Sequence, residues 1–216
     1  ILTHPHADHV VGQIGVMKRF NVRRVLTTGV VHTTDEYLAW LKEIKQQKIA
    51  MQIAQTGQTF AVGDAQLTIL YPAESFEGRR VQEGKLGEGG GLNDTSIVAK
   101  LTYGDTSFIL MGDVTSVVEK ELLDTKSVDP HDIRGSVLRS DVLKVGHHGS
   151  KYSSSREFLK AVEPRYAVIQ VGKNRYGHPA FATLYRLKQA GVEVFRNDTD
   201  GDVVFESDGE AINVIR

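Results

Sequence analysis

The stretch "ILTHPHADHVVG" constrains the fold of this chain more than any other part of the sequence. It places four polar groups within six positions, at His4, His6, Asp8 and His9. The apolar residues before them are typical of the end of a buried strand, and those after them are typical of a helix. A strand-to-helix loop of this kind predicts a metal site, because imidazole and carboxylate suit zinc, manganese or iron better than calcium.

The chain has 216 residues and no cysteine, so a metal must be held by imidazole, carboxylate, amide or water. Its composition, 40% hydrophobic and 25% charged, is that of an ordinary globular protein. The apolar runs are too short to span a membrane. We expect residues 1–216 to form a single α/β domain with its polar motifs at strand ends.

Periodicity and turn chemistry predict the order of the elements. Strands are predicted over 22–27, 49–54, 65–71, 95–103, 106–111, 141–146, 166–172, 192–195, 202–205 and 211–215. Helices are predicted after the histidine loop and over 37–44, 117–123, 154–162 and 179–191. A glycine-rich mobile loop is predicted over 75–91, irregular chain over 124–140, and a turn at "NDTDG".

Local motifs predict where three of these helices begin. Thr33 with Glu36, and Ser154 with Glu157, have the spacing of a capping box. Pro179 is expected in the first turn of the helix that ends near residue 191, where its missing N–H costs nothing.

Positive charge is concentrated in one part of the chain. The net charge is −1, which argues against a uniformly basic nucleic-acid binder. Residues 139–188, however, contain ten basic and three acidic side chains, a charge of +7 that leaves −8 on the rest. This segment is either a set of solvated helix faces or a local surface for anions.

The opening motif resembles the H-x-H-x-D-H signature of the metallo-β-lactamase superfamily. The resemblance implies a four-layered αββα sandwich with one or two metal ions at the edge of the paired sheets. It also implies an aspartate after a hydrophobic strand that bridges the two ions, and "FILMGD" supplies Asp113. A bridging carboxylate offsets the repulsion between two dications.

Two positions differ from the family pattern or leave a choice open. Where the superfamily usually has a further histidine ligand, the chain has Asn93, twenty residues before Asp113. An amide there would weaken the first metal site or favour manganese, or Asn93 simply orders a turn. The last ligand is expected from "LKVGHHGS". We favour His147 as the ligand, with His148 facing the substrate, and the reverse assignment remains open.

A narrower resemblance rests on "THPHADH", "NDTSIV", "GD", "LKVGHHGS" and "YGHP", in this order. The set is similar to the C-terminal hydrolase domain of ComEC-type DNA-uptake proteins and their stand-alone relatives. It implies single-stranded DNA as substrate, a membrane channel in the full-length protein, and the extracytoplasmic face of the membrane as location. A stand-alone relative would instead be cytoplasmic or secreted.

In the superfamily several strands precede the metal loop. We therefore expect the chain to be an N-terminally truncated domain, with "IL" as the end of the last missing strand. Such a domain would have an uncovered sheet edge and would be poorly stable or inactive when taken alone.

The region after the paired histidines also suits phosphate. Lys151 offers a cation, and a helix beginning near Ser154 would present free N–H groups. Ser150 adds a hydroxyl, and Arg175, Tyr176 and His178 precede another helix. Tyr152, Tyr176 and Tyr185 lie in the basic segment and would either stack on bases or belong to the core.

Together these features predict a metal-dependent hydrolase, a phosphodiesterase or nuclease of single-stranded DNA in DNA uptake. It uses two divalent ions, zinc or manganese, and no cofactor nucleotide. The predicted metal ligands are His4, His6, Asp8, His9, Asp113 and His147. The predicted catalytic residues are Asp8, His148 and His178. The predicted phosphate-binding residues are Asn93, Ser150, Lys151, Arg175 and Tyr176.

The alternatives are a hydrolase of a small phosphoester, ester or lactone, a metal-binding regulatory module without activity, and a β-lactamase proper. Fold and ligands alone do not separate the first from the preferred function. The Asn93 departure and the basic loop argue against the last.

Overall fold

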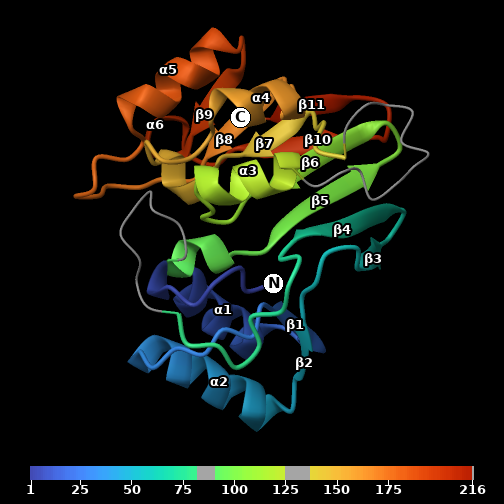
Figure 1. Ribbon diagram of the computed structural model, residues 1–216. Coiled ribbons are helices and arrows are strands. Elements are labelled where there is room, and N and C mark those ends of the chain that lie inside the picture. Colours follow the sequence, from blue (N-terminus) through green and yellow to red (C-terminus); the bar gives the residue numbers. More distant parts are fainter. Residues whose placement is uncertain (82–90, 125–136, 216) are drawn as a thin grey trace.

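A computed structural model of the chain describes residues 1–81, 91–124 and 137–215 (Figure 1). Its elements form four layers in the order helices, sheet, sheet, helices. The predicted αββα sandwich is therefore confirmed.

The larger sheet has seven strands in the order β3-β4-β5-β6-β7-β8-β9. Neighbours from β3 to β6 run antiparallel, and those from β6 to β9 run parallel. The parallel half matters most for function, because its strands end at one common edge. The strands are β3 (Thr59–Val62), β4 (Ala65–Tyr71), β5 (Val98–Tyr103), β6 (Thr106–Leu110), β7 (Val142–Lys144), β8 (Tyr166–Ile169) and β9 (Glu193–Arg196).

The smaller sheet pairs β1 (Arg24–Thr27) with β2 (Ala50–Ile53) in parallel, and Leu2 forms a bridge to Thr27. Alternate residues of β1 face opposite layers, as a strand requires. Val25 packs under α1 (Ala7–Arg19) and α2 (Asp35–Gln47) with the fully buried Trp40. Leu26 packs against Ile69 and Ala99 of the larger sheet. This apolar layer joins the two sheets.

Three helices cover the other face of the larger sheet: α3 (Ser116–Asp124), α4 (Arg156–Val162) and α5 (Phe181–Gln189). Their buried side chains meet Leu143 and Ala167 of β7 and β8. On the opposite face, the hairpin β10 (Val204–Ser207) and β11 (Ile212–Ile215) packs on Tyr166 and Phe195. The short elements are η1 (Leu92–Thr95), η2 (Gly146–Gly149) and α6 (Asn197–Asp200).

Several predicted boundaries are wrong. Thr34, not Thr33, precedes α2, and no side chain caps that helix. Ser155, not Ser154, caps α4, accepting from the Phe158 N–H at 3.3 Å. Pro179 lies before α5, which begins at Phe181. "NDTDG" contains the single helical turn of α6, and β3 was not predicted because three of its four residues are exposed.

The predicted mobile loop and irregular segment lie largely outside the described residues, at 82–90 and 125–136. None of the described helices has the length and apolar run that crossing a bilayer requires.

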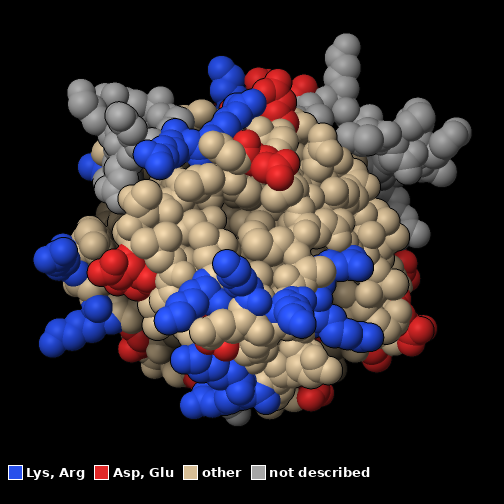
Figure 2. All heavy atoms as spheres, turned by 90° about the horizontal axis from the view of Figure 1, so that it is seen from below, with Lys and Arg blue, Asp and Glu red and all other residues tan. Residues whose placement is uncertain are grey.

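Basic side chains also gather on the face formed by α1 and α2 (Figure 2). Lys18 and Arg19 of α1, and Lys42 and Lys45 of α2, are exposed. Positive charge is therefore not confined to residues 139–188, although the rest of the chain is acidic on balance. This second basic face lies on the outer helix layer.

Candidate metal centre

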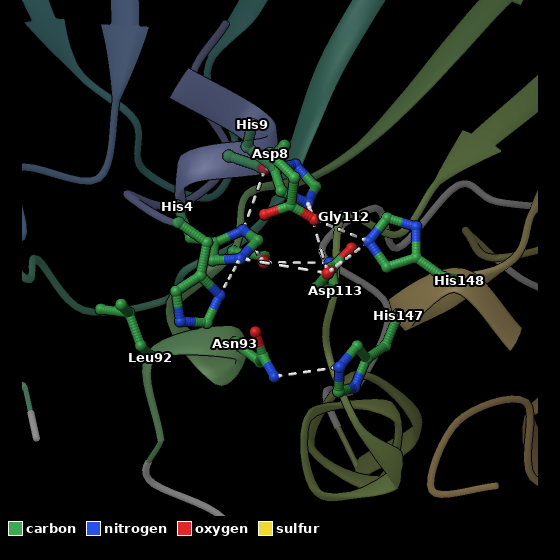
Figure 3. Close-up of polar contacts among 12 residues, drawn as sticks. His4, Asp8, His9, Leu92, Asn93, Gly112, Asp113, His147 and His148 are labelled. Atoms are coloured by element: carbon green, nitrogen blue, oxygen red, sulfur yellow. Dashed lines mark hydrogen bonds and ion pairs between the residues drawn. The ribbon is translucent and has the colours of Figure 1, made fainter. Parts of the chain in front are cut away.

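Neighbouring parallel strands deliver the polar motifs to one edge of the larger sheet. β6 is followed by Gly112 and Asp113, and β7 is followed by η2 with the paired histidines. The His147 N–H donates to the Gly112 carbonyl at 3.2 Å and joins the two strand ends. The histidine loop before α1 meets this edge from the other sheet (Figure 3).

Four side chains converge at this edge. Donor atoms of Asp8, His9, Asp113 and His148 all lie within 4.8 Å of one another. His148 Nε2 is 3.2 Å from Oδ2 of both Asp8 and Asp113. His9 Nε2 is 3.3 Å from the same oxygen of Asp113. Residues far apart in sequence thus form one compact cluster.

The cluster fits a divalent ion. Two imidazoles and two carboxylates are a donor set that suits zinc, manganese or iron. His9 Nε2, His148 Nε2 and Asp113 Oδ1 are buried, and among the described residues they have charged neighbours but no hydrogen bond. Burying polar atoms without hydrogen bonds costs free energy, and a cation shared by the cluster would offset this cost.

A second group of donors lies beside the first. His4 is 1% exposed, and its Nε2 lies 2.9 Å from Nδ1 of His6. The same Nε2 is 4.0 Å from Oδ2 of Asp113, so Asp113 lies between the two groups. Thr3 and Ser96 approach His4 Nδ1 at 3.2 and 3.1 Å and fix the ring orientation, as partners of metal-bound histidines do.

The two histidines of η2 turn to different partners. Both have left-handed backbone, with φ of 47° at His147 and 51° at His148. His147 Nε2 lies 3.3 Å from the Asn93 amide nitrogen, and its ring centroid lies 5.4 Å from that of His178. His148 reaches the carboxylates instead. This geometry favours the reverse of the preferred assignment, with His148 as the ligand and His147 facing the pocket.

The carboxylates and His148 shift one another's protonation. The contact with His148 lowers the pKa of Asp8 to about 2. Burial would raise the pKa of Asp113, but contacts from His148 and His9 hold it well below the usual range. Asp113 and Asp8 in turn raise the pKa of His148 to about 10. A metal ion at His148 would replace the proton that this imidazole otherwise carries.

Lys144 is a site residue that the sequence analysis missed. Its ammonium donates to the Gly112 carbonyl at 2.7 Å and lies 3.6 Å from Oδ1 of Asp113. Burial lowers the pKa of Lys144, while Asp113 opposes the shift. The signal was present in the sequence: Lys144 is a charged residue at the end of an otherwise apolar strand, just before the paired histidines.

A pocket of about 700 Å³ opens beside the cluster. Its walls include predicted substrate residues from three segments, namely Asn93, Ser150, Lys151, Tyr176 and His178. Arg175 is not among the lining residues; its guanidinium lies 5.8 Å from the ring centroid of Tyr176. Ser150 is only 1% exposed, and its hydroxyl accepts from the Tyr152 N–H at 3.4 Å.

The expected anion site at the start of α4 is wrong. The N–H groups of Ser154 and Ser155 donate to the buried carboxylate of Glu119, the latter at 2.8 Å. Arg186 holds the same segment by donating to the Ser153 and Ser154 carbonyls, each at 2.7 Å. Glu119 and Arg186 thereby fasten the loop that carries the paired histidines.

Replacing Glu119 by alanine is expected to lower the free energy of unfolding by about 2–4 kcal/mol, because a buried and a half-buried N–H group lose their acceptor. Urea denaturation of the purified protein measures this loss. Lys120→Ala, at an exposed position of the same helix, is the control and should change stability by less than about 0.5 kcal/mol. An equally small change for Glu119→Ala would contradict the clamping role.

An αββα sandwich with a histidine–aspartate cluster at its sheet edge is an arrangement found in metallo-hydrolases, and the cluster is a candidate metal site. The sequence matches the model of the metallo-beta-lactamase superfamily over residues 1–173, and the chain belongs to this superfamily.

Curated relatives include competence proteins. The chain is 31% identical over 208 residues to "ComE operon protein 3" of Bacillus subtilis. The aligned segment covers 95% of the chain and 24% of the relative. It is 36% identical over 114 residues to "Competence protein ComA" of Neisseria gonorrhoeae, covering 52% of the chain and 15% of the relative. The chain thus spans a quarter or less of the length of these relatives.

Solved structures with a similar fold include the β-hydroxylase CmlA. A mutant form of CmlA aligns with a TM-score of 0.51 at 14% identity, and the alignment covers 90% of the present chain and 42% of the CmlA chain. CmlA of Streptomyces venezuelae, a diiron β-hydroxylase, aligns with a TM-score of 0.50 at 14% identity. This alignment covers 99% of the present chain and 44% of the CmlA chain. At this identity the likeness concerns the fold alone.

Proposed function

We propose that the chain is a dinuclear metal-dependent phosphodiesterase that acts on single-stranded DNA. The observation that carries the proposal is the convergence of Asp8, His9, Asp113 and His148 next to a pocket lined by Lys151. A compact acidic and imidazole cluster suits divalent ions, and a lysine beside it suits the phosphate that such ions help to cleave.

In this proposal His4 and His6 would hold one ion, and Asp8, His9 and His148 would hold the other. Asp113 would serve both, since its Oδ2 lies near both donor groups. When bound, the ions polarise the phosphoryl oxygens and acidify a water molecule. The Lys144 ammonium lies 3.6 Å from Oδ1 of Asp113 and offsets part of the negative charge of this carboxylate.

Other side chains of the pocket act on the substrate. The carboxylate of Asp8 is exposed and can orient the attacking water. Lys151 is exposed and can pair with a non-bridging phosphate oxygen. His178 lines the pocket, and its Nδ1 is buried without a hydrogen-bond partner among the described residues. It can protonate the leaving oxygen or hold the phosphate.

One curated relative is named a competence protein, and this name supports a related role for the chain, which we propose to be DNA uptake. We propose that the chain works as the hydrolase part of such a system at the extracytoplasmic face of the membrane, next to a membrane channel. As the chain covers 24% of its Bacillus subtilis relative, there is room in such a protein for a channel part.

A panel of small substrates tests the reaction class. Protein loaded with zinc or manganese is expected to hydrolyse bis-p-nitrophenyl phosphate, to lose this activity to a chelator, and to regain it with metal. Such activity in the 216-residue chain alone would contradict the expectation from sequence that truncation leaves it inactive. Faster hydrolysis of a lactone or carboxylic ester would favour the small-molecule alternative, and nitrocefin turnover would favour a β-lactamase. Bound metal with no turnover of any substrate would favour a regulatory module.

A further inference from the structure

Three exposed aromatic side chains belong to the segment that forms one wall of the pocket: Tyr176 lines the pocket, and Phe181 and Tyr185 follow on α5. Phe181 is 82% exposed, Tyr176 71% and Tyr185 45%. Phe181 is more exposed than any other large apolar side chain among the described residues. An aromatic side chain left in water at the start of a helix contributes almost nothing to the core, so its position calls for another role.

The rings are arranged in parallel pairs. Phe181 and Tyr185, one helical turn apart on α5, have centroids 6.2 Å apart and an interplanar angle of 26°. Tyr176 and His178 have the same angle with centroids 6.0 Å apart. Flat faces presented in this way suit a partner that is itself flat.

This aromatic surface is fastened to the metal loop. The Ala180 N–H donates to the Gly149 carbonyl at 2.8 Å, and the buried Thr183 hydroxyl donates to the Ser150 carbonyl at 2.7 Å. Tyr176 and Ala180 both line the pocket, and Phe181 follows Ala180 directly. The first turn of α5 therefore continues the pocket wall outward.

The segment that carries these rings is basic. Residues 164–192 contain no acidic side chain, and Lys173, Arg175 and Lys188 are exposed. The Arg175 guanidinium lies over the Tyr176 ring, and the Lys151 ammonium lies 4.9 Å from the ring centroid of Tyr152. Aromatic faces interleaved with cations are what binding proteins offer to the bases and phosphates of a single strand.

We propose that Phe181 and Tyr185, together with Tyr176, form a stacking track for the bases next to the scissile phosphate. This inference rests on the proposed function and extends it, because it assigns a binding site on α5 outside the metal centre. The occupant is single-stranded nucleic acid, whose bases need no sequence match to stack on a ring.

The test compares binding with small-substrate turnover. In the double variant Phe181→Ala/Tyr185→Ala, the Kd for a fluorescent oligo-dT is expected to rise at least about fivefold, the lower limit for one lost base stack. Hydrolysis of bis-p-nitrophenyl phosphate should remain within about twofold. Phe20→Ala is the matched control, because Phe20 is 65% exposed next to α1 and should leave the Kd unchanged.

An unchanged Kd for oligo-dT in the double variant, or an equal rise of the Kd in the Phe20 variant, would contradict the proposed stacking site. Failure of the proposed function looks different: the wild-type protein would then leave bis-p-nitrophenyl phosphate intact whatever the Kd for oligo-dT.

A spectroscopic readout separates stacking from general attraction. The chain has one tryptophan, Trp40, which is fully buried, so Phe181→Trp adds a single exposed indole. Stacking predicts that oligo-dT quenches this fluorescence and that the variant keeps the wild-type Kd. A blue shift with anionic phospholipid vesicles and no quenching by oligo-dT would overturn the proposal in favour of a membrane surface.

Discussion

Replacing Asp113 by asparagine is expected to reduce metal-dependent hydrolysis of bis-p-nitrophenyl phosphate by more than about 100-fold. Loss of an outer partner of a metal ligand alone costs roughly 10–100-fold in affinity or activity, and Asp113 is proposed to bind both ions directly. Its Oδ2 lies 3.2 Å from His148 and 3.3 Å from His9, at the centre of the cluster. Steady-state rates and the metal content per chain measure the effect.

The substitution keeps the size of the side chain, so the fold can be checked by circular dichroism. Asp64→Asn, at an exposed position between β3 and β4, removes the same charge away from the cluster and should keep the wild-type rate. If Asp113→Asn folds and retains both metal ions and activity, the bridging role is wrong.

Asparagine substitutions at His147 and His148 are expected to have very different effects. Asparagine tolerates the left-handed backbone that both positions adopt, so the two variants are matched in strain. His148→Asn should lose the ion held with Asp8 and His9, and activity should fall more than about 100-fold. His147→Asn should keep two ions per chain and change mainly the KM for the phosphodiester.

Metal titration followed by calorimetry gives the number of ions bound by each variant. The opposite pattern, with an ion lost only in His147→Asn, would restore His147 as the ligand. That result would also mean that His148 moves away from Asp8 and Asp113, which lie 3.2 Å from its Nε2, when metal binds.

The fold and most members of the cluster were predictable from local sequence. Apolar runs that end in polar motifs, such as "SFILMGD" and "DVLKVG", indicated both the strands and the edge where they end. The dense loop from His4 to His9 indicated metal ligands by composition alone. Helix starts were less predictable, because several serines in succession could cap α4, and contacts from Glu119 and Arg186 on other helices hold this segment in place.

What the sequence could not provide depends on contacts across the fold. The proposed choice of His148 over His147 rests on the directions that two left-handed residues in succession give to these side chains, which no local pattern encodes. Lys144 becomes a site residue only because β6 and β7 are neighbours, which brings Gly112 and Asp113 to its ammonium. The exposure of Phe181 likewise follows from how Ala180 and Thr183 anchor α5.

The most direct test of the proposed function is cleavage of a labelled single-stranded oligonucleotide by the purified, metal-loaded protein, followed on a denaturing gel. We predict shortened products that disappear with a chelator and with Asp113→Asn, and that return when metal is restored to the wild-type protein. An oligonucleotide that stays intact while two ions are bound per chain would contradict a phosphodiesterase of single-stranded DNA.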